Sequence, residues 1–232
     1  MIKAVRIFNS NILFKIAVLM IALISLCFCA GFVLGVLSGE NEILSPQAEQ
    51  VAEDIPLETI NIITSCILGY ISAMAITGSA VNVFYKTDGC KYARTIKNAD
   101  KLFCSSLVGS QILSHLTAIA LSGVISVIMT LFDCTKALNI PVVILFSLAS
   151  SLLFDIIIRP LLSIKSGNAR FGLILITLFL VSAVVSAAFI ATQTLNYQIM
   201  LISGGILTLA AGIGAVISTV SSCRYIRRNW LS

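Results

Sequence analysis

Charge is scarce in this chain. Asp, Glu, Lys and Arg make up only 11% of its 232 residues, whereas they make up about 25% of a typical soluble domain. Hydrophobic residues account for 58% of the chain, which excludes an ordinary water-soluble globular protein. The alternating segments of about ten residues that build a membrane β-barrel are missing as well. A helical membrane protein is the class that remains.

Groups that perform catalysis or bind metals are equally few. His115 is the only histidine, and the seven cysteines form no Cys-x-x-Cys pair. A lone histidine supplies neither a zinc site nor a catalytic pair. The chain has no glycine-rich phosphate loop ending in Lys-Ser/Thr and no His-Glu-x-x-His. We therefore expect a non-catalytic chain without a metal, without a directly bound cofactor and without a nucleic-acid partner.

Six long apolar runs are what the chain has instead. A helix of about twenty apolar residues crosses the roughly 30 Å hydrocarbon core of a bilayer, and in lipid a helix satisfies its own backbone hydrogen bonds. We predict an all-α polytopic membrane protein with a single six-helix transmembrane domain over residues 1–232. The predicted spans are residues 13–37, 59–85, 102–132, 140–158, 171–192 and 198–223. The first run is too long for a signal-peptide core, so we expect a retained span.

The basic residues predict the orientation of these spans. When six spans are assumed, every lysine and arginine except Lys136 falls on one side of the membrane. The loop of residues 38–58, on the opposite side, contains acidic residues and no basic ones. Because short cytoplasmic loops are enriched in Lys and Arg, both termini are expected in the cytoplasm. The expected location is a bacterial plasma membrane, crossed several times.

The acidic outer loop has a helical pattern of its own. Ser45 followed by Pro46 is a favourable helix start. Apolar residues recur at helical spacing around it, at Leu44, Ala48, Val51 and Ile55. We predict a short amphipathic helix over residues 45–56 that lies on the outer membrane surface. Its acidic residues are interpreted as a solvated face rather than as an attractor for a cationic substrate.

His115 is the most notable polar residue within a predicted span. One interpretation is a proton relay or a substrate contact, because ionisable residues inside a membrane are costly and are associated with function. The other is a hydrogen bond to Ser or Thr on a neighbouring helix. We favour the second interpretation, because the sequence offers no evident carboxylate at a matching mid-span position.

Asp155 and Arg159 lie at the cytoplasmic end of the fourth predicted span. Their i, i+4 spacing places both on one helix face, with the acid in the favourable N-terminal position. We predict a structural ion pair between them, with a gating element as the alternative.

Small residues predict close helix packing. Gly31 and Gly35 form a Gly-x-x-x-Gly step in the first predicted span, and Gly69 and Ala73 form a similar step in the second. Such faces allow two helices to approach closely. The sequence leaves open whether these faces form a dimer interface or pack within one chain.

A charged segment interrupts the apolar chain at residues 83–103. It carries five basic residues, Lys86, Lys91, Arg94, Lys97 and Lys101. Tyr92 and Ile96 are spaced i, i+4, which predicts a short amphipathic helix over residues 86–101. Anionic lipid headgroups account for the positive charge. They do not account for the turn at Asp88-Gly89 or for the ordered apolar pair, which together favour a protein partner.

These features resemble the permease subunits of type-2 ABC exporters. The resemblance is carried by six spans, two cytoplasmic ends, and the motif FYKTDG (84–89) followed by YARTI (92–96). In that family the segment is a coupling helix that docks into a groove on a separate ATPase. Many members have a proline where this helix meets the third span, and here Asn98-Ala99 takes its place. The resemblance implies that the coupling residues are Asp88, Gly89, Tyr92, Arg94, Ile96 and Lys97.

The same resemblance implies function and partners. The chain would form the translocation pathway for a peptide, a bacteriocin or a small amphipathic drug, together with a second, identical or different, permease copy. A cytosolic ABC ATPase would supply the energy, with ATP and Mg bound on that partner. The first alternative is the substrate-capture subunit of a vitamin importer. The second is an intramembrane enzyme, which the shortage of mid-span His, Asp and Glu disfavours.

Overall fold

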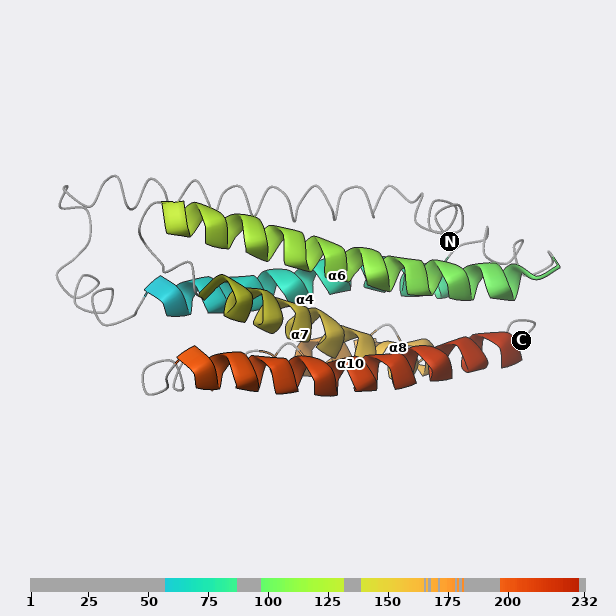
Figure 1. Cartoon of the computed structure of the whole chain (residues 1–232). Coiled ribbons are helices and arrows are strands. Elements are labelled where there is room, and N and C mark those ends of the chain that lie inside the picture. The colour runs from blue at the N-terminus through green and yellow to red at the C-terminus, as the bar shows by residue number, and fades with distance from the viewer. Residues whose placement is uncertain are drawn as a thin grey trace.

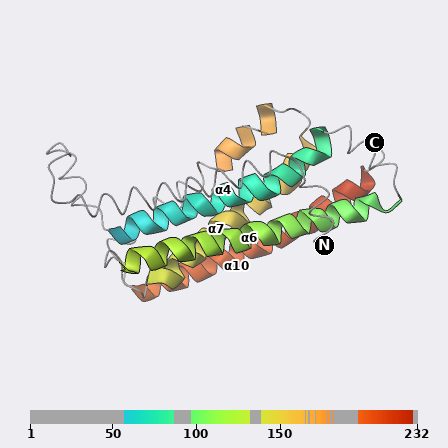
Figure 2. The same ribbon diagram turned by 90° about the horizontal axis from the view of Figure 1, so that it is seen from above.

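The computed structural model contains helices and no strands over the part of the chain that it describes. These residues are 57–86, 97–131, 139–164, 166, 168–170, 172–177, 179, 181 and 197–229. The helices are α4 (Leu57–Lys86), α6 (Ala99–Leu131), α7 (Ile140–Ile156), α8 (Ile158–Ser163) and α10 (Tyr197–Arg228). Figure 2 shows the long helices lying lengthwise beside one another.

Four stretches of the described chain are long and apolar enough to cross a membrane. They are Asn61–Val81, Ala99–Leu131, Ile140–Ser163 and Tyr197–Arg228. They coincide with four of the spans predicted from sequence, so the all-α membrane-type fold is confirmed at this level. The predicted first span (13–37) and outer helix (45–56) lie outside the described residues, and so does most of the predicted fifth span (171–192).

Side-chain hydrogen bonds show that α4 and α6 are antiparallel. Asn61 Nδ2 donates to Ser126 Oγ at 3.2 Å, and Thr77 Oγ1 donates to Ser114 Oγ at 3.3 Å. The residue number of the partner on α6 decreases as the residue number along α4 increases, as is expected for two antiparallel helices. Polar bonds of this kind link helices in an apolar environment.

Helices α7 and α10 run in the same direction (Figure 1). Thr208 Oγ1 donates to the Leu145 carbonyl at 3.0 Å, and Ser218 Oγ donates to the Ile156 carbonyl at 2.8 Å. Residues 172–177 of the stretch between α8 and α10 contact α4, because the Tyr70 hydroxyl donates to the Ile174 carbonyl at 3.1 Å.

A proline near the start of α8 separates this helix from α7, so that only Ile157 lies between the two. Pro160 has no N–H to donate to the Ile156 carbonyl, and such a proline breaks or kinks a helix. Ile157 instead forms a turn, with its N–H directed to the Phe154 carbonyl at 3.2 Å. The Ser218 hydroxyl of α10 satisfies the carbonyl that Pro160 leaves open. The break is thus compensated by a neighbouring helix.

Small residues bring α4 and α10 close to α7. A Cβ atom added at Gly69 would collide with the backbone carbonyl of Ser147, and one added at Gly214 would lie 2.9 Å from Ile156 Cδ1. Ala73 is fully buried. The step formed by Gly69 and Ala73 therefore packs within the chain, whereas Gly31 and Gly35 lie outside the described residues.

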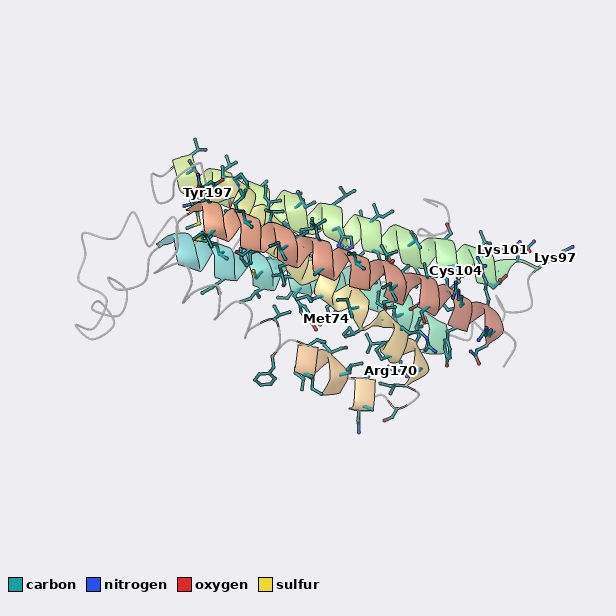
Figure 3. All side chains as sticks on the ribbon, turned by 60° about the horizontal axis from the view of Figure 1, so that its bottom comes forward. Met74, Lys97, Lys101, Cys104, Arg170 and Tyr197 are labelled. Atoms are coloured by element: carbon teal, nitrogen blue, oxygen red, sulfur yellow. The ribbon has the colours of Figure 1, made fainter. Side chains whose placement is uncertain are left out.

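Several of the described basic residues lie at one end of the bundle. Figure 3 shows Lys97, Lys101 and Cys104 together at this end, with Tyr197 at the other. The Cys104 thiol is 3.8 Å from the Cys223 carbonyl, so the start of α6 lies beside the end of α10. The last turn of α10 contributes Arg227 and Arg228. We refer to this region as the basic end.

The segment before α6 turns sharply at Asn98. Asn98 has a φ of 65°, a left-handed conformation that asparagine adopts more readily than most residues. Its carbonyl accepts the N–H groups of Lys101 and Leu102 at 3.1 and 3.2 Å. Residues 99–101, predicted as the end of the coupling helix, therefore belong to the first turn of α6.

Candidate functional site

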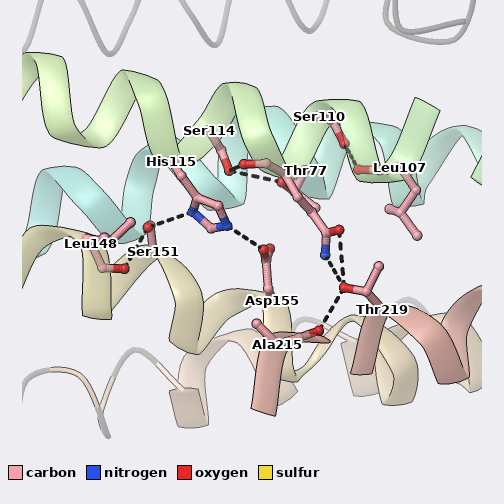
Figure 4. A network of polar contacts seen from close by, with 11 residues as sticks. Thr77, Leu107, Ser110, Ser114, His115, Leu148, Ser151, Asp155, Ala215 and Thr219 are labelled. Atoms are coloured by element: carbon pink, nitrogen blue, oxygen red, sulfur yellow. Dashed lines mark hydrogen bonds and ion pairs between the residues drawn. The ribbon is translucent and has the colours of Figure 1, made fainter. Parts of the chain in front are cut away.

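A histidine–aspartate pair links two helices of the bundle (Figure 4). His115 Nε2 on α6 is 2.9 Å from Asp155 Oδ2 on α7. The Asp155 side chain is only 2% exposed, and that of His115 is 19% exposed. His115 Nδ1 lies 2.9 Å from Ser151 Oγ, one turn before Asp155 on α7. One imidazole ring thus contacts two successive turns of α7.

Two expectations from sequence are wrong at this site. His115 does have a carboxylate partner at mid-span, because the antiparallel packing of α6 and α7 brings Asp155 to it. Asp155 is not paired with Arg159: the break at Ile157 interrupts the helix between them, and the Arg159 guanidinium carbon lies 4.1 Å from the centre of the Tyr225 ring. The expected hydrogen bond from His115 to a neighbouring serine is confirmed.

The Ser151 hydroxyl limits the protonation states of the pair. Ser151 Oγ lies 2.8 Å from the Leu148 carbonyl, which only accepts hydrogen bonds. When the hydroxyl proton points there, His115 Nδ1 has to carry a proton to bond Ser151. One further proton then lies between Nε2 and Oδ2, and the pair is neutral overall. When the hydroxyl instead donates to Nδ1, an imidazole protonated at Nε2 faces a carboxylate, and the pair is anionic.

A second polar pair lies one turn away, between α6 and α10. Gln111 Nε2 donates to Thr219 Oγ1 at 2.8 Å, and Thr219 also donates to the Ala215 carbonyl at 2.7 Å. Gln111 and His115 are spaced i, i+4 and therefore share one face of α6. That face carries the polar groups toward both α7 and α10.

A groove of about 660 Å³ opens beside these residues. It is formed by α6, α7 and α10, and its polar lining includes Gln111, His115, Asp155 and Thr219. The rest of the lining is mainly aliphatic, such as Leu209, Ile213 and Val216 on α10. An apolar cavity with a few convergent polar groups is typical of a small-molecule site.

Ser151, His115 and Asp155 have the composition of a hydrolase triad, but their placement does not suit nucleophilic catalysis. Ser151 is fully buried, and it is absent from the groove lining. Its hydroxyl lies 2.8 Å from the Leu148 carbonyl, one turn earlier in the same helix. A nucleophile has to reach a reacting atom at a distance of about 3 Å. Ser151 instead orients the His115 ring toward Asp155.

Most of the residues assigned to ATPase coupling lie outside the described part of the chain. They are Asp88, Gly89, Tyr92, Arg94 and Ile96. Lys97 is described: it is exposed and lies in the turn before α6, at the basic end. The polar network at mid-bundle is thus separate from Lys97, the one coupling residue that the structure describes.

Sequence reasoning missed Gln111, Ser151 and Thr219 as members of the site. Ser and Thr occur throughout the spans, so neither Ser151 nor Thr219 stood out. A signal was nevertheless present for Gln111, because it precedes His115 by four residues. A polar pair at that spacing indicates one polar face on an otherwise apolar helix.

Comparison with known proteins identifies no relative. No protein-family model, curated protein or solved structure matches the chain.

Proposed function

We propose that this chain is the non-catalytic permease subunit of an ATP-driven ABC exporter in a bacterial plasma membrane. The observation that carries the proposal is the His115–Asp155 pair beside a groove inside an apolar bundle. Ionisable side chains at membrane depth are rare, and they commonly mark a substrate or ion pathway. The groove would form part of the translocation pathway for a small amphipathic drug or peptide.

The basic end supports coupling to a separate ATPase. The predicted coupling segment leads into α6 at this end, where Lys97 is exposed. Arg159 of α8 and the last turn of α10 lie at the same end, since Arg159 stacks on Tyr225. The chain has no phosphate-binding loop of its own. An ATPase docked here would contact the segment that connects α4 to α6.

The directions of the helices support six spans. Helices α4, α7 and α10 run one way and α6 runs the other (Figure 1). These directions are those expected if α4, α6, α7 and α10 are the second, third, fourth and sixth spans. The fifth span would then lie in the stretch between α7 and α10. A second permease copy and membrane lipids would complete the assembly.

Co-purification tests this function. The tagged chain would be isolated from its native membranes in mild detergent, and the co-purifying proteins would be identified by mass spectrometry. We expect an ATPase that carries a Gly-x-x-x-x-Gly-Lys-Ser/Thr loop. The double variants Tyr92→Ala/Ile96→Ala and Arg94→Glu/Lys97→Glu should each reduce its recovery at least tenfold while membrane insertion is retained.

A charge reversal on the opposite loop provides the control. Lys136→Glu changes the same charge on the predicted outer side, so ATPase recovery should equal that of the unmodified chain. Recovery of no such ATPase, or equal recovery with all three variants, would contradict the proposal.

A further inference from the structure

One oxygen of Asp155 is buried without a partner. Oδ2 is bonded to His115, whereas Oδ1 makes no hydrogen bond of ordinary geometry among the described residues, although the residue is only 1% exposed. The Gln111 side chain is the other polar group close to this carboxylate. Leaving a buried charged acceptor unsatisfied costs about 1–3 kcal/mol or more. Asp155 also lines the groove. Oδ1 itself is covered, so a donor in the groove reaches it once the side chains around Asp155 move aside.

The surroundings of this oxygen define the chemical class of such a donor. The groove wall on α10 is aliphatic and includes Leu209, Ile213 and Ile217, each at least 64% exposed. An apolar wall suits an apolar group, and a carboxylate suits a cation with N–H donors. Both features are met by an amphipathic molecule that carries a protonated amine.

We propose that the groove binds an amphipathic amine, whose ammonium group donates to Asp155 Oδ1 in exchange for one proton. In the empty site the Ser151 hydroxyl donates to the Leu148 carbonyl at 2.8 Å, so Nδ1 and the Nε2–Oδ2 bond each carry a proton and the pair is neutral. Binding of the ammonium would otherwise leave one uncompensated positive charge at membrane depth. Such a charge is costly, so the pair releases a proton as the amine binds.

The exchange is balanced in atoms and charge. The proton on His115 Nδ1 leaves to solvent, and the Ser151 hydroxyl turns from the Leu148 carbonyl to donate to Nδ1. Nε2–H continues to donate to Oδ2, and the ammonium donates to Oδ1. One cation has entered and one proton has left, so the occupied site is neutral like the empty one.

No other charged group on the packed helices competes in this exchange. Within the described spans, α4 faces the site with Thr77, which reaches Ser114, and α10 faces it with Thr219. The next charged residues along α6, α8 and α10 are Lys101, Arg159 and Arg224, toward the basic end. The one-proton stoichiometry therefore belongs to the His115–Asp155 pair.

This inference rests on the proposed function, because it treats the groove as part of the translocation pathway. It adds the chemical class of the transported substrate, an amphipathic amine. The two remain separable by experiment. Amine binding is measured on the purified chain without any ATPase. Recovery of an ATPase is measured without any amine.

Calorimetry with a matched pair of probes tests the exchange. 1-Naphthylmethylamine carries the ammonium, and 1-naphthylmethanol has the same aromatic group without the charge. We expect the amine to bind the detergent-solubilised chain at least tenfold more tightly than the alcohol. Titrations in buffers of different ionisation enthalpy should show that one proton is released for each amine bound. The dissociation constant should therefore fall by up to about tenfold for each unit by which the pH is raised.

Three variants make the test specific. Asp155→Asn should lose the preference for the amine, and Asp100→Asn, the same change in the first turn of α6, should retain it. His115→Gln keeps a donor to Asp155 but has no ring nitrogen that can give up a proton, so it should bind the amine without releasing one. Equal binding of amine and alcohol, no proton release by the unmodified chain, or unchanged proton release in His115→Gln would each overturn the proposal.

Discussion

At the residue scale, the stability of the bundle depends on the partner of Asp155. Loss of His115 leaves a carboxylate that is 2% exposed without its neighbour. Removal of one member of a buried ion pair costs about 3–5 kcal/mol. We therefore expect His115→Ala to lower the thermal unfolding midpoint markedly in detergent, as measured by circular dichroism.

A double variant separates the pair from the packing around it. His115→Leu combined with Asp155→Leu removes both charges, and replacement of a whole buried pair by apolar residues is often nearly neutral. The double variant should therefore unfold at a higher temperature than His115→Leu alone. An unfolding midpoint that falls additively would show that the two side chains are not energetically coupled.

At the scale of elements, the junction of α7 and α8 depends on a hydroxyl from α10. Ser218 Oγ donates at 2.8 Å to the Ile156 carbonyl that Pro160 cannot bond. Ser218→Ala should cost about 1–2 kcal/mol, because it removes the donor from a carbonyl inside the bundle. In a Pro160→Ala background an N–H is restored at position 160, so the same change at Ser218 should cost less. Thermal unfolding of the unmodified chain, the two single variants and the double variant measures this coupling. An equal loss of stability from Ser218→Ala in both backgrounds would contradict it.

The positions of the helices were more predictable than their contacts. Apolar runs place four spans to within a few residues, because burial in lipid requires length and hydrophobicity alone. The His115–Asp155 pair depends on the register of two antiparallel helices, which no local pattern encodes. The predicted Asp155–Arg159 pair failed for a local reason that was visible in sequence, since Pro160 indicates a break between these two residues.

At the scale of the whole molecule, the basic end predicts the orientation in the membrane. Lys97, Lys101, Arg159 and the last turn of α10 lie at that end, and Lys and Arg favour the cytoplasmic side. Green fluorescent protein fused after residue 232 should fluoresce, and alkaline phosphatase fused at the same place should be inactive. Alkaline phosphatase inserted at residue 136 should be active. The reverse pattern would invert the proposed topology.

The close contact at Gly69 has a mechanical consequence. Because the backbone of α4 touches that of α7 there, this pair of helices is stiff and has little room to slide or tilt. The seam between α6 and α10 is softer, since long side chains such as Gln111 and the open groove separate the two backbones. A bundle built in this way deforms first where α6 meets α10, so strain applied at the basic end would widen the groove before it disturbed the α4–α7 pair.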